Sequence, residues 1–310
     1  MPHFIEQHGD PQIPPPYSFP NVTIHSFRLA ANMGALTELC NARLNIGTRD
    51  KRGFEYRPIL PFVDLEVLHY PRMLSADPRF EWGWLTQREC YFRLIVGRYD
   101  FTAGGPAPAE AAVFIPHIFV DNAWSVISGR EVVGFPKVMA TFTTPDSENS
   151  QTERLYPIQV VADVFEKYSV KSTQCRCSIV EIENSQVGQG MGDVPPETIW
   201  PWGVLPKKLD PAWLPFLQDK TRFATVQLKQ IRDAEQAELA CYQALIHAEF
   251  DIGRMELRTL PAAEISIPRY DSLRIEQEMG LMGERLQPLW QYTVNCDLKF
   301  GKVRNLFVNG

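Results

Sequence analysis

Hydrophobic positions along this chain recur mainly at the spacing of strands. Apolar side chains that alternate or run together predict strands over residues 22–28, 61–70, 89–98, 112–120, 156–165, 175–183, 223–232, 240–252 and 289–300. Helical spacing is confined to two short stretches, one from Ala35 to Cys40 and one that begins after Asp121 or Asn122, either of which can cap a helix. Gly129 is predicted to end the second helix.

The balance of these elements favours an α+β fold. Strands clearly outnumber helices and the two do not alternate regularly, which argues against a parallel sheet of the Rossmann type. The pattern indicates a mostly antiparallel α+β or barrel-like domain. Because Gly104-Gly105-Pro106 separates the runs at 89–98 and 112–120, these two strands are predicted to form a long hairpin. No repeat or flexible linker divides the sequence, so residues 1–310 are predicted to form one domain.

Two segments are predicted to lie outside the regular elements. Residues 11–20 are rich in proline, which lacks a backbone N–H and therefore disfavours a helix or a central strand. We expect residues 1–20 to form an extended arm lying on the domain. Residues 184–214 are rich in glycine, proline and tryptophan, and they are predicted to form a long loop excursion.

Composition and charge narrow the class of protein. The net charge is −6 and no basic block stands out, so no nucleic-acid partner is expected. The first residues do not resemble a secretory signal, and no run reaches the roughly 18 apolar residues of a membrane span, so we expect a cytoplasmic protein. Isolated histidines lack metal-ligand spacing, and no dinucleotide motif is present, so neither a metal nor a cofactor is predicted.

The cysteines do not form an evident framework of disulfides. Of the six cysteines, only Cys175 and Cys177 are close in sequence. A single Cys-x-Cys pair is weak evidence for a metal site, because structural metal sites draw on a second pair of ligands. All six are therefore expected to be free thiols in a reducing compartment.

One lysine lies in an unusual context. Lys137 occurs in Val-Val-Gly-Phe-Pro-Lys-Val-Met-Ala, and no other charged residue is found between positions 132 and 145. The residues alone leave two interpretations. The side chain either reaches solvent from a surface strand, or it is partly buried among apolar neighbours.

The surroundings of Lys137 resemble the signature of the acetoacetate decarboxylase family. Val120-Asp121-Asn122, Gly129-Arg130-Glu131 and Gly134-Phe135-Pro136-Lys137 follow one another without a gap, at spacings that match the family. Phe62-Val63-Asp64-Leu65-Glu66-Val67 is similar to a family strand that carries an active-site glutamate. The resemblance covers residues 20–142, and beyond them only the strand pattern fits.

The resemblance implies a cone-like, mostly antiparallel sheet and a carbon–carbon lyase without a cofactor. Lys137 would form an imine (Schiff base) with a small keto acid, and Glu66 and Glu89 would either handle protons or repel the departing carboxylate. Phe27-Arg28 resembles the family's active-site arginine, so Arg28 would bind the substrate carboxylate. Phe135 and Met139 would supply an apolar wall. By analogy with the family, a homo-oligomer is expected.

Each of these roles has a structural alternative. Arg28 can equally belong to a structural ion pair, and Glu66 and Glu89 can be a buried pair satisfied by Arg130 or by the backbone. Arg130 and Glu131 are expected to brace the loop that carries Lys137.

Two departures from the family bear on the chemistry. An amine attacks a ketone only when neutral, whereas a free lysine, with a reference pKa of about 10.4, is almost entirely charged at neutral pH. A neighbouring cation or burial lowers such a pKa. Val138 stands where the family usually has a second lysine, so burial would have to act alone, and Gln87 stands where a tyrosine is usual. The outcome therefore stays open between decarboxylation, an aldol–dehydration or cyclisation through the same imine, and binding without catalysis.

Overall fold

The computed structural model describes residues 5, 11–80, 82–144, 156–185, 201–202 and 209–309. Its strands are β1 (Tyr17–Ala30), β2 (Phe54–Pro58), β3 (Phe62–Ser75), β4 (Trp84–Thr102), β5 (Gly105–Val120), β6 (Lys137–Thr143), β7 (Ile158–Val164), β8 (Cys175–Asn184), β9 (Arg222–Arg232), β10 (Ala240–Thr259), β11 (Ala263–Ser266), β12 (Arg285–Leu286) and β13 (Trp290–Val308). The helical elements are α1 (Met33–Arg43), α2 (Arg49–Arg52), η1 (Pro78–Phe80), α3 (Ala123–Ser128), η2 (Gly129–Val133), η3 (Pro211–Trp213), α4 (Leu214–Leu217) and α5 (Ile275–Met279).

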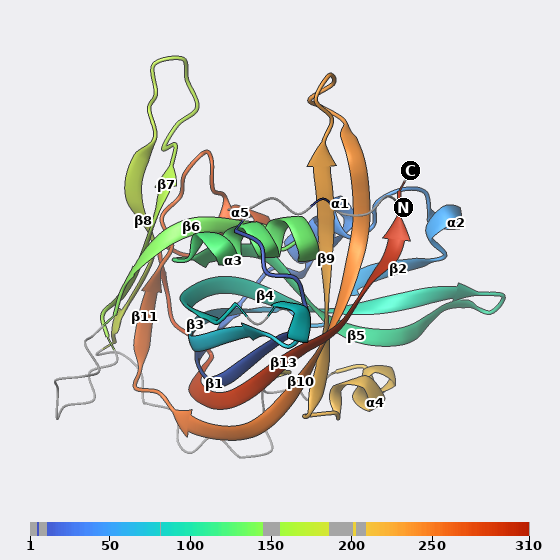
Figure 1. Cartoon of the computed structure of the whole chain (residues 1–310), viewed down its shortest axis with the longest axis horizontal. Coiled ribbons are helices and arrows are strands. Elements are labelled where there is room, and N and C mark those ends of the chain that lie inside the picture. Colours follow the sequence, from blue (N-terminus) through green and yellow to red (C-terminus); the bar gives the residue numbers. More distant parts are fainter. Residues whose placement is uncertain are drawn as a thin grey trace.

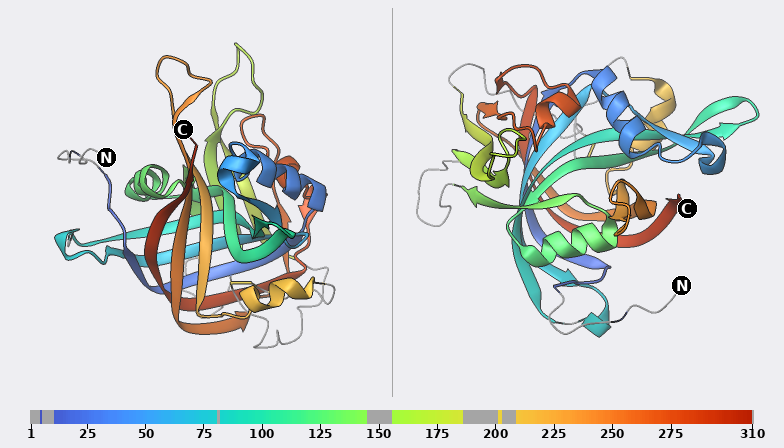
Figure 2. Two further views of the ribbon diagram at one scale, coloured as in Figure 1. Left: turned by 90° about the vertical axis from the view of Figure 1, so that its right-hand side faces the viewer. Right: turned by 90° about the horizontal axis from the view of Figure 1, so that it is seen from above.

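Part of the sheet closes into a ring. The strand order β5-β9-β10-β13-β1-β3-β4 returns to β5, because β4 also pairs with β5. Figure 2 shows β9, β10 and β13 side by side along one wall of this ring. The predicted fold is confirmed: strands predominate, the helices are short, and nearly all pairings are antiparallel. The long hairpin is also confirmed, because β4 and β5 pair from Glu89↔Val120 to Thr102↔Gly105.

A second run of strands branches from the ring. It begins at β6, which pairs in parallel with the end of β5, and continues through β7, β8, β11 and β12. In Figure 1, β7 and β8 stand apart from the ring on the side where β6 leaves it. The branch point is therefore the start of β6, which is where Lys137 lies.

Strand alternation divides the core into two clusters of buried side chains. Successive residues of a strand point to opposite faces, so Tyr91 and Ile95 of β4 join the cluster inside the ring. Phe92 and Leu94 of the same strand join a cluster outside it, together with α1, α5 and the branching strands. Because β4 is buried on both faces, its sequence is a nearly continuous apolar run, and the polar residues that interrupt this run require an explanation.

The start of β1 departs from the prediction. The strand begins at Tyr17, so the predicted arm over residues 1–20 is wrong for residues 17–20, which belong to β1 and of which 17–19 pair with neighbouring strands. Proline is tolerated because the register with β13 shifts between Phe19 and Val22, and Asn21 has a positive φ of 56°. At such a bulge the missing N–H of a proline costs no pairing hydrogen bond.

The remaining predictions concern the 184–214 excursion, the short elements and membrane-spanning helices. Of the predicted excursion over 184–214, residues 186–200 and 203–208 lie outside the described residues, and η3 and the start of α4 occupy its end. The short elements β2, β11, β12 and α5 were not predicted, because runs this brief carry little periodicity. Among the described residues, no helix has the length and apolar character required to cross a membrane.

Candidate functional site

Lys137 projects into the ring. Its side chain is buried, at 8% exposure, which answers the choice between a surface and a buried lysine. The Nζ atom donates to Ser125 Oγ at 2.7 Å and forms an ion pair with Glu89 Oε1. Lys137, Glu89 and Ser125, here called the Lys137 cluster, therefore join three separate elements: β6, β4 and α3.

The Asp-Asn motif fixes α3 beside β4. Asn122 caps the helix, accepting from Trp124 N at 3.0 Å, and its Nδ2 donates to Thr86 O at 3.1 Å. Asp121 Oδ1 accepts from Arg88 N at 2.7 Å. Because these bonds attach the helix start to β4 just before Glu89, they bring Ser125 and Glu89 to the same ammonium group.

The Gly-Arg-Glu motif makes room for the lysine and holds its backbone. A Cβ on Gly129 would lie 2.5 Å from Lys137 Cδ, so a larger residue would collide with the side chain. Arg130 NH1 donates to Lys137 O at 3.1 Å, as expected for a residue that braces the loop. Gly129 is the C-cap of α3, as predicted, but it does not end the helical path. Its φ of −64° is helical, and the chain continues through η2 to Gly134, whose φ is +84°.

The Lys137 cluster borders a cavity inside the ring, here called the lysine cavity. The cavity offers about 70 Å³ to the centres of water-sized molecules. One water needs about 10–15 Å³ on this measure, so the space suits a ligand of a few non-hydrogen atoms. Alternate residues of β4 supply its polar side: Gln87, Glu89, Tyr91 and Arg93. Its remaining wall is largely apolar, from residues such as Phe19, Ile115, Phe135, Phe223 and Phe300.

Glu89 is held by further side chains at the cavity. Gln87 Nε2 donates to Glu89 Oε1 at 3.1 Å. Burial, followed by the charge of Glu89 and a hydrogen bond to it, raises the pKa of Tyr70 well above its ordinary value, so the phenol stays protonated. Gln87, which replaces the tyrosine usual in the family, therefore supplies a donor to this carboxylate.

Glu66 lies behind the cavity and does not line it. It is fully buried, accepts from Tyr91 Oη at 2.7 Å, and pairs with Arg93 at 2.9 Å. Burial raises the pKa of Glu66 even though Arg93 opposes the shift. Glu66 therefore contacts two residues that line the lysine cavity, Tyr91 and Arg93, but not the cavity itself.

Arg28 does not reach the lysine cavity either. It makes a bidentate ion pair with Asp64, through bonds of 2.7 Å and 2.9 Å, and is almost fully buried. Arg93 approaches the same carboxylate at 3.2 Å. Burial alone would raise the pKa of Asp64, but the two guanidinium groups hold it below its ordinary value. Arg28, Asp64, Arg93 and Glu66, here called the Arg28 cluster, thus form a paired network, as the structural alternative for Arg28 anticipated.

The residues around Lys137 in β6 divide between the two sides of the strand. Phe135 lines the cavity, and its ring centroid lies 5.9 Å from Lys137 Nζ. Met139 is 46% exposed and does not line the cavity, so the structure does not support it as part of the apolar wall. Val138 is also exposed, because the residue after an inward-facing one on a strand points outward. A second lysine at this position would point away from the cavity.

Three residues of the site were missed by the sequence analysis. Ser125, Tyr91 and Arg93 were not singled out, although each lines the cavity. A signal existed for all of them. Tyr91 and Arg93 stand two and four residues after Glu89 and so share its face of the strand. Ser125 and Gly129 are four residues apart, and therefore share one face of the helical segment.

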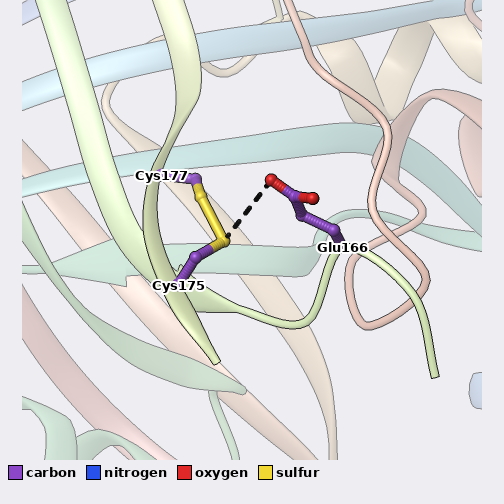
Figure 3. Close-up of side chains that lie close together, drawn as sticks. All are labelled: Glu166, Cys175 and Cys177. Carbon is purple, nitrogen blue, oxygen red and sulfur yellow. Dashed lines mark hydrogen bonds between the residues drawn. A yellow bond between two sulfur atoms is a disulfide. The ribbon is translucent and has the colours of Figure 1, made fainter. Parts of the chain in front are cut away.

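The cysteines supply the one group of potential metal ligands found within the described part of the chain. The ligand atoms of Glu166, Cys175 and Cys177 lie within 4.8 Å of one another (Figure 3). The expectation of free thiols is wrong for this pair, because the structure joins Cys175 and Cys177 in a disulfide, which leaves no thiolate for a metal. Two residues apart on β8, their side chains project to the same face.

Comparisons with known proteins concern the family and the fold. The model of the family described as acetoacetate decarboxylase (ADC) matches residues 1–154, and no curated protein matches the chain. The acetoacetate decarboxylase of Legionella pneumophila subsp. pneumophila str. Philadelphia 1 is 12% identical, with 95% of this chain and 88% of that chain covered and a TM-score of 0.56. An acetoacetate decarboxylase-like enzyme from Sphingomonas wittichii RW1 is 13% identical, with 98% of both chains covered and a TM-score of 0.55.

A third solved structure is the enduracididine biosynthesis enzyme MppR in complex with pyruvate. It is 15% identical to this chain, with 95% of this chain and 91% of that chain covered and a TM-score of 0.50. At such low identities these likenesses establish a shared fold, and the reaction has to be argued from the site itself.

Proposed function

The chain belongs to the acetoacetate decarboxylase family, and from this we propose that it is a carbon–carbon lyase that forms an imine between Lys137 and a small keto acid. The observation that carries the proposal is the buried Lys137 ammonium group, which contacts Glu89 and Ser125 at the edge of a small cavity. Enclosure by a mostly apolar cavity is one of the ways in which nucleophilic lysines are activated, and the neighbouring carboxylate can serve as the base.

Imine formation requires a proton acceptor for the ammonium group. Glu89 forms an ion pair with Lys137 Nζ and can take up this proton, which leaves a neutral amine. The nitrogen lone pair then attacks the ketone carbon, and the carbonyl oxygen becomes a hydroxyl group. Protonation of that hydroxyl by Glu89 releases water and leaves a protonated imine. Ser125, at 2.7 Å from Nζ, is placed to hold the oxygen in these steps.

The protonated imine then accepts an electron pair from the substrate. In a β-keto acid, the bond to the carboxylate breaks, CO2 leaves, and its electrons form an enamine. A proton delivered to the enamine carbon restores the imine, and water releases the product and the free lysine. Glu89 has by then given up its proton with the released water, so it takes a new proton from solvent and passes it to this carbon, while Tyr70 and Gln87 hold its carboxylate in place.

We assign recognition of the substrate carboxylate to Arg93. It lines the lysine cavity, whereas Arg28 does not, and a planar guanidinium group suits two carboxylate oxygens. Arg28 acts as a positioning residue, because it holds Asp64, which in turn holds Arg93. Glu66 fixes Arg93 from its other side.

A second outcome uses the same enamine. Attack on an aldehyde would form a carbon–carbon bond, and loss of water would complete an aldol–dehydration. The two outcomes are separated by product analysis, because only decarboxylation releases CO2.

Imine trapping tests the proposal directly. Borohydride added with acetoacetate or pyruvate should reduce the imine and attach the ligand covalently to the peptide that carries Lys137, as read by mass spectrometry. Lys299, an exposed lysine on β13, provides the control, so Lys299→Met should leave the adduct and Lys137→Met should abolish it. An adduct that persists in Lys137→Met, or that never forms, would contradict the proposal and favour a relative that binds without catalysis.

Two further proposals concern the state of the protein in the cell. We propose that it is a cytoplasmic homo-oligomer, on the basis of the sequence pattern and the family. Light scattering of the purified chain measures the oligomer, and a monomeric mass would contradict this assignment.

A further inference from the structure

A second cavity lies behind the loop that carries Lys137. It offers about 300 Å³ to the centres of water-sized molecules and is here called the second cavity. One side is formed by Gln227–Ile231 of β9, and the other by Arg130 and Glu131 of η2 with the loop that follows. Phe135 borders both cavities, while Glu89 and Ser125 border only the lysine cavity.

The charges around the second cavity are mainly positive. Arg43, Arg130 and Lys229 line it, and Glu131 is the acidic residue among its described lining. Arg43 is already paired with Glu278 at 3.2 Å. Lys229 has no ion pair within 4 Å among the described residues, and burial lowers its pKa although Glu131 opposes the shift. An anion placed here would compensate this half-buried ammonium group.

A buried amide gives a second, independent indication of a ligand. Gln227 is 1% exposed and lines the second cavity, and neither its Oε1 nor its Nε2 has a hydrogen-bond partner among the described residues. Leaving a buried polar group unpaired costs more than a typical hydrogen bond contributes. The amide needs one partner that accepts from Nε2 and one that donates to Oε1.

We propose that the second cavity binds a small carboxylate that also carries a hydroxyl group. The carboxylate would pair with Lys229 and Arg130, and the hydroxyl group would donate to Gln227 Oε1. The site would also be connected to the reactive lysine, because Arg130 donates to Lys137 O at 3.1 Å. The binding site does not depend on the proposed lyase activity, since Lys137 does not line it.

Calorimetric titration of the full chain with L-malate and with succinate tests the hydroxyl requirement. These dicarboxylates differ by one hydroxyl group, so the wild-type protein should bind malate about tenfold more tightly. Gln227→Met keeps the shape of the side chain and should remove this preference. Lys229→Met should weaken both ligands about equally, and Lys299→Met should change neither.

Two results would overturn the proposal. One is the absence of saturable malate binding to the wild-type protein, which would mean that water alone satisfies Gln227. The other is malate binding that is lost in Lys137→Met but retained in Lys229→Met, which would place the ligand in the lysine cavity. Should Gln227→Met fail to fold, Lys229→Met still decides between the two cavities, because its side chain is only half-buried.

Discussion

Two clusters of buried charged residues each include a residue of strand β4. They differ in how completely their charges are paired within the protein. In the Arg28 cluster, Asp64 pairs with two guanidinium groups, so its charges are compensated within the protein. In the Lys137 cluster, one ammonium group meets one carboxylate at the edge of a cavity. Burying charge is costly unless it is paired. Apart from Arg93, which also lines the lysine cavity, the first cluster therefore has a structural role, and the second leaves an open side from which a ligand can approach.

The sharpest test of this comparison removes the reactive amine. Lys137→Met should reduce turnover of the trapped keto acid by about 10³-fold or more, because no other lysine is found among the described residues that line the lysine cavity. Steady-state kinetics measures the loss, and circular dichroism checks that the ring remains folded. Activity within tenfold of the wild type would remove Lys137 from the mechanism.

Substitution of the two glutamates should affect kcat differently in the two clusters. Glu89→Gln should lower kcat by about 10²- to 10⁴-fold, the usual range for loss of a positioned acid–base group. Glu66→Gln should lower it much less, because Glu66 does not line the lysine cavity. Parallel pH–rate profiles of both variants make the comparison, and equal losses of kcat would erase the distinction between the clusters.

For stability we expect the reverse, with the larger loss on substitution in the Arg28 cluster. Asp64→Asn leaves the buried Arg28 without its compensating charge and Arg93 with Glu66 alone, and should lower the free energy of unfolding by about 3–5 kcal/mol. Asp100→Asn provides a matched control, since Asp100 pairs with Arg98 at a half-exposed position and should cost less than about 1 kcal/mol. Denaturant titration measures both, and similar costs would contradict a structural role for the Arg28 cluster.

The smallest expected effect concerns pH. The pKa of Glu66 in the folded chain lies above its ordinary value of 4.5, so the folded state holds this proton at pH values where the unfolded chain has released it. The contribution of Glu66 to stability therefore falls as the pH rises from 4.5 through its folded pKa. Glu66→Gln should flatten the pH dependence of unfolding in that interval, whereas Glu183→Gln, at an exposed position, should not. An unchanged slope in Glu66→Gln would show that burial does not perturb this carboxyl.

The sequence identified Lys137 but not all of the residues that surround it. Motif spacing identified Lys137, Glu89 and Phe135, and all three border the lysine cavity. It also suggested Arg28 and Met139, which do not. Membership of a buried ion pair depends on which strands become neighbours, and pairing such as Arg28↔Asp64 between β1 and β3 leaves no mark on either strand alone.

Gly129 and Pro20 show that one residue type can occupy a position for different structural reasons. Glycine is a common helix end, but Gly129 is required for the space its missing side chain gives to Lys137. Proline disfavours strands, yet Pro20 is accepted at a bulge. At both positions the local sequence is consistent with two structural roles, and tertiary contacts determine which one the residue has.

The ring joins its earliest and latest strands directly, because β1 lies between β13 and β3. A ribosome therefore delivers Lys137 and Glu89 long before the wall that encloses them can be completed. Contacts between residues so distant in the chain make folding slow. A chain interrupted before Trp290–Val308 would carry the reactive amine without its enclosure, and would be exposed to aggregation through the unpaired edges of β1 and β10.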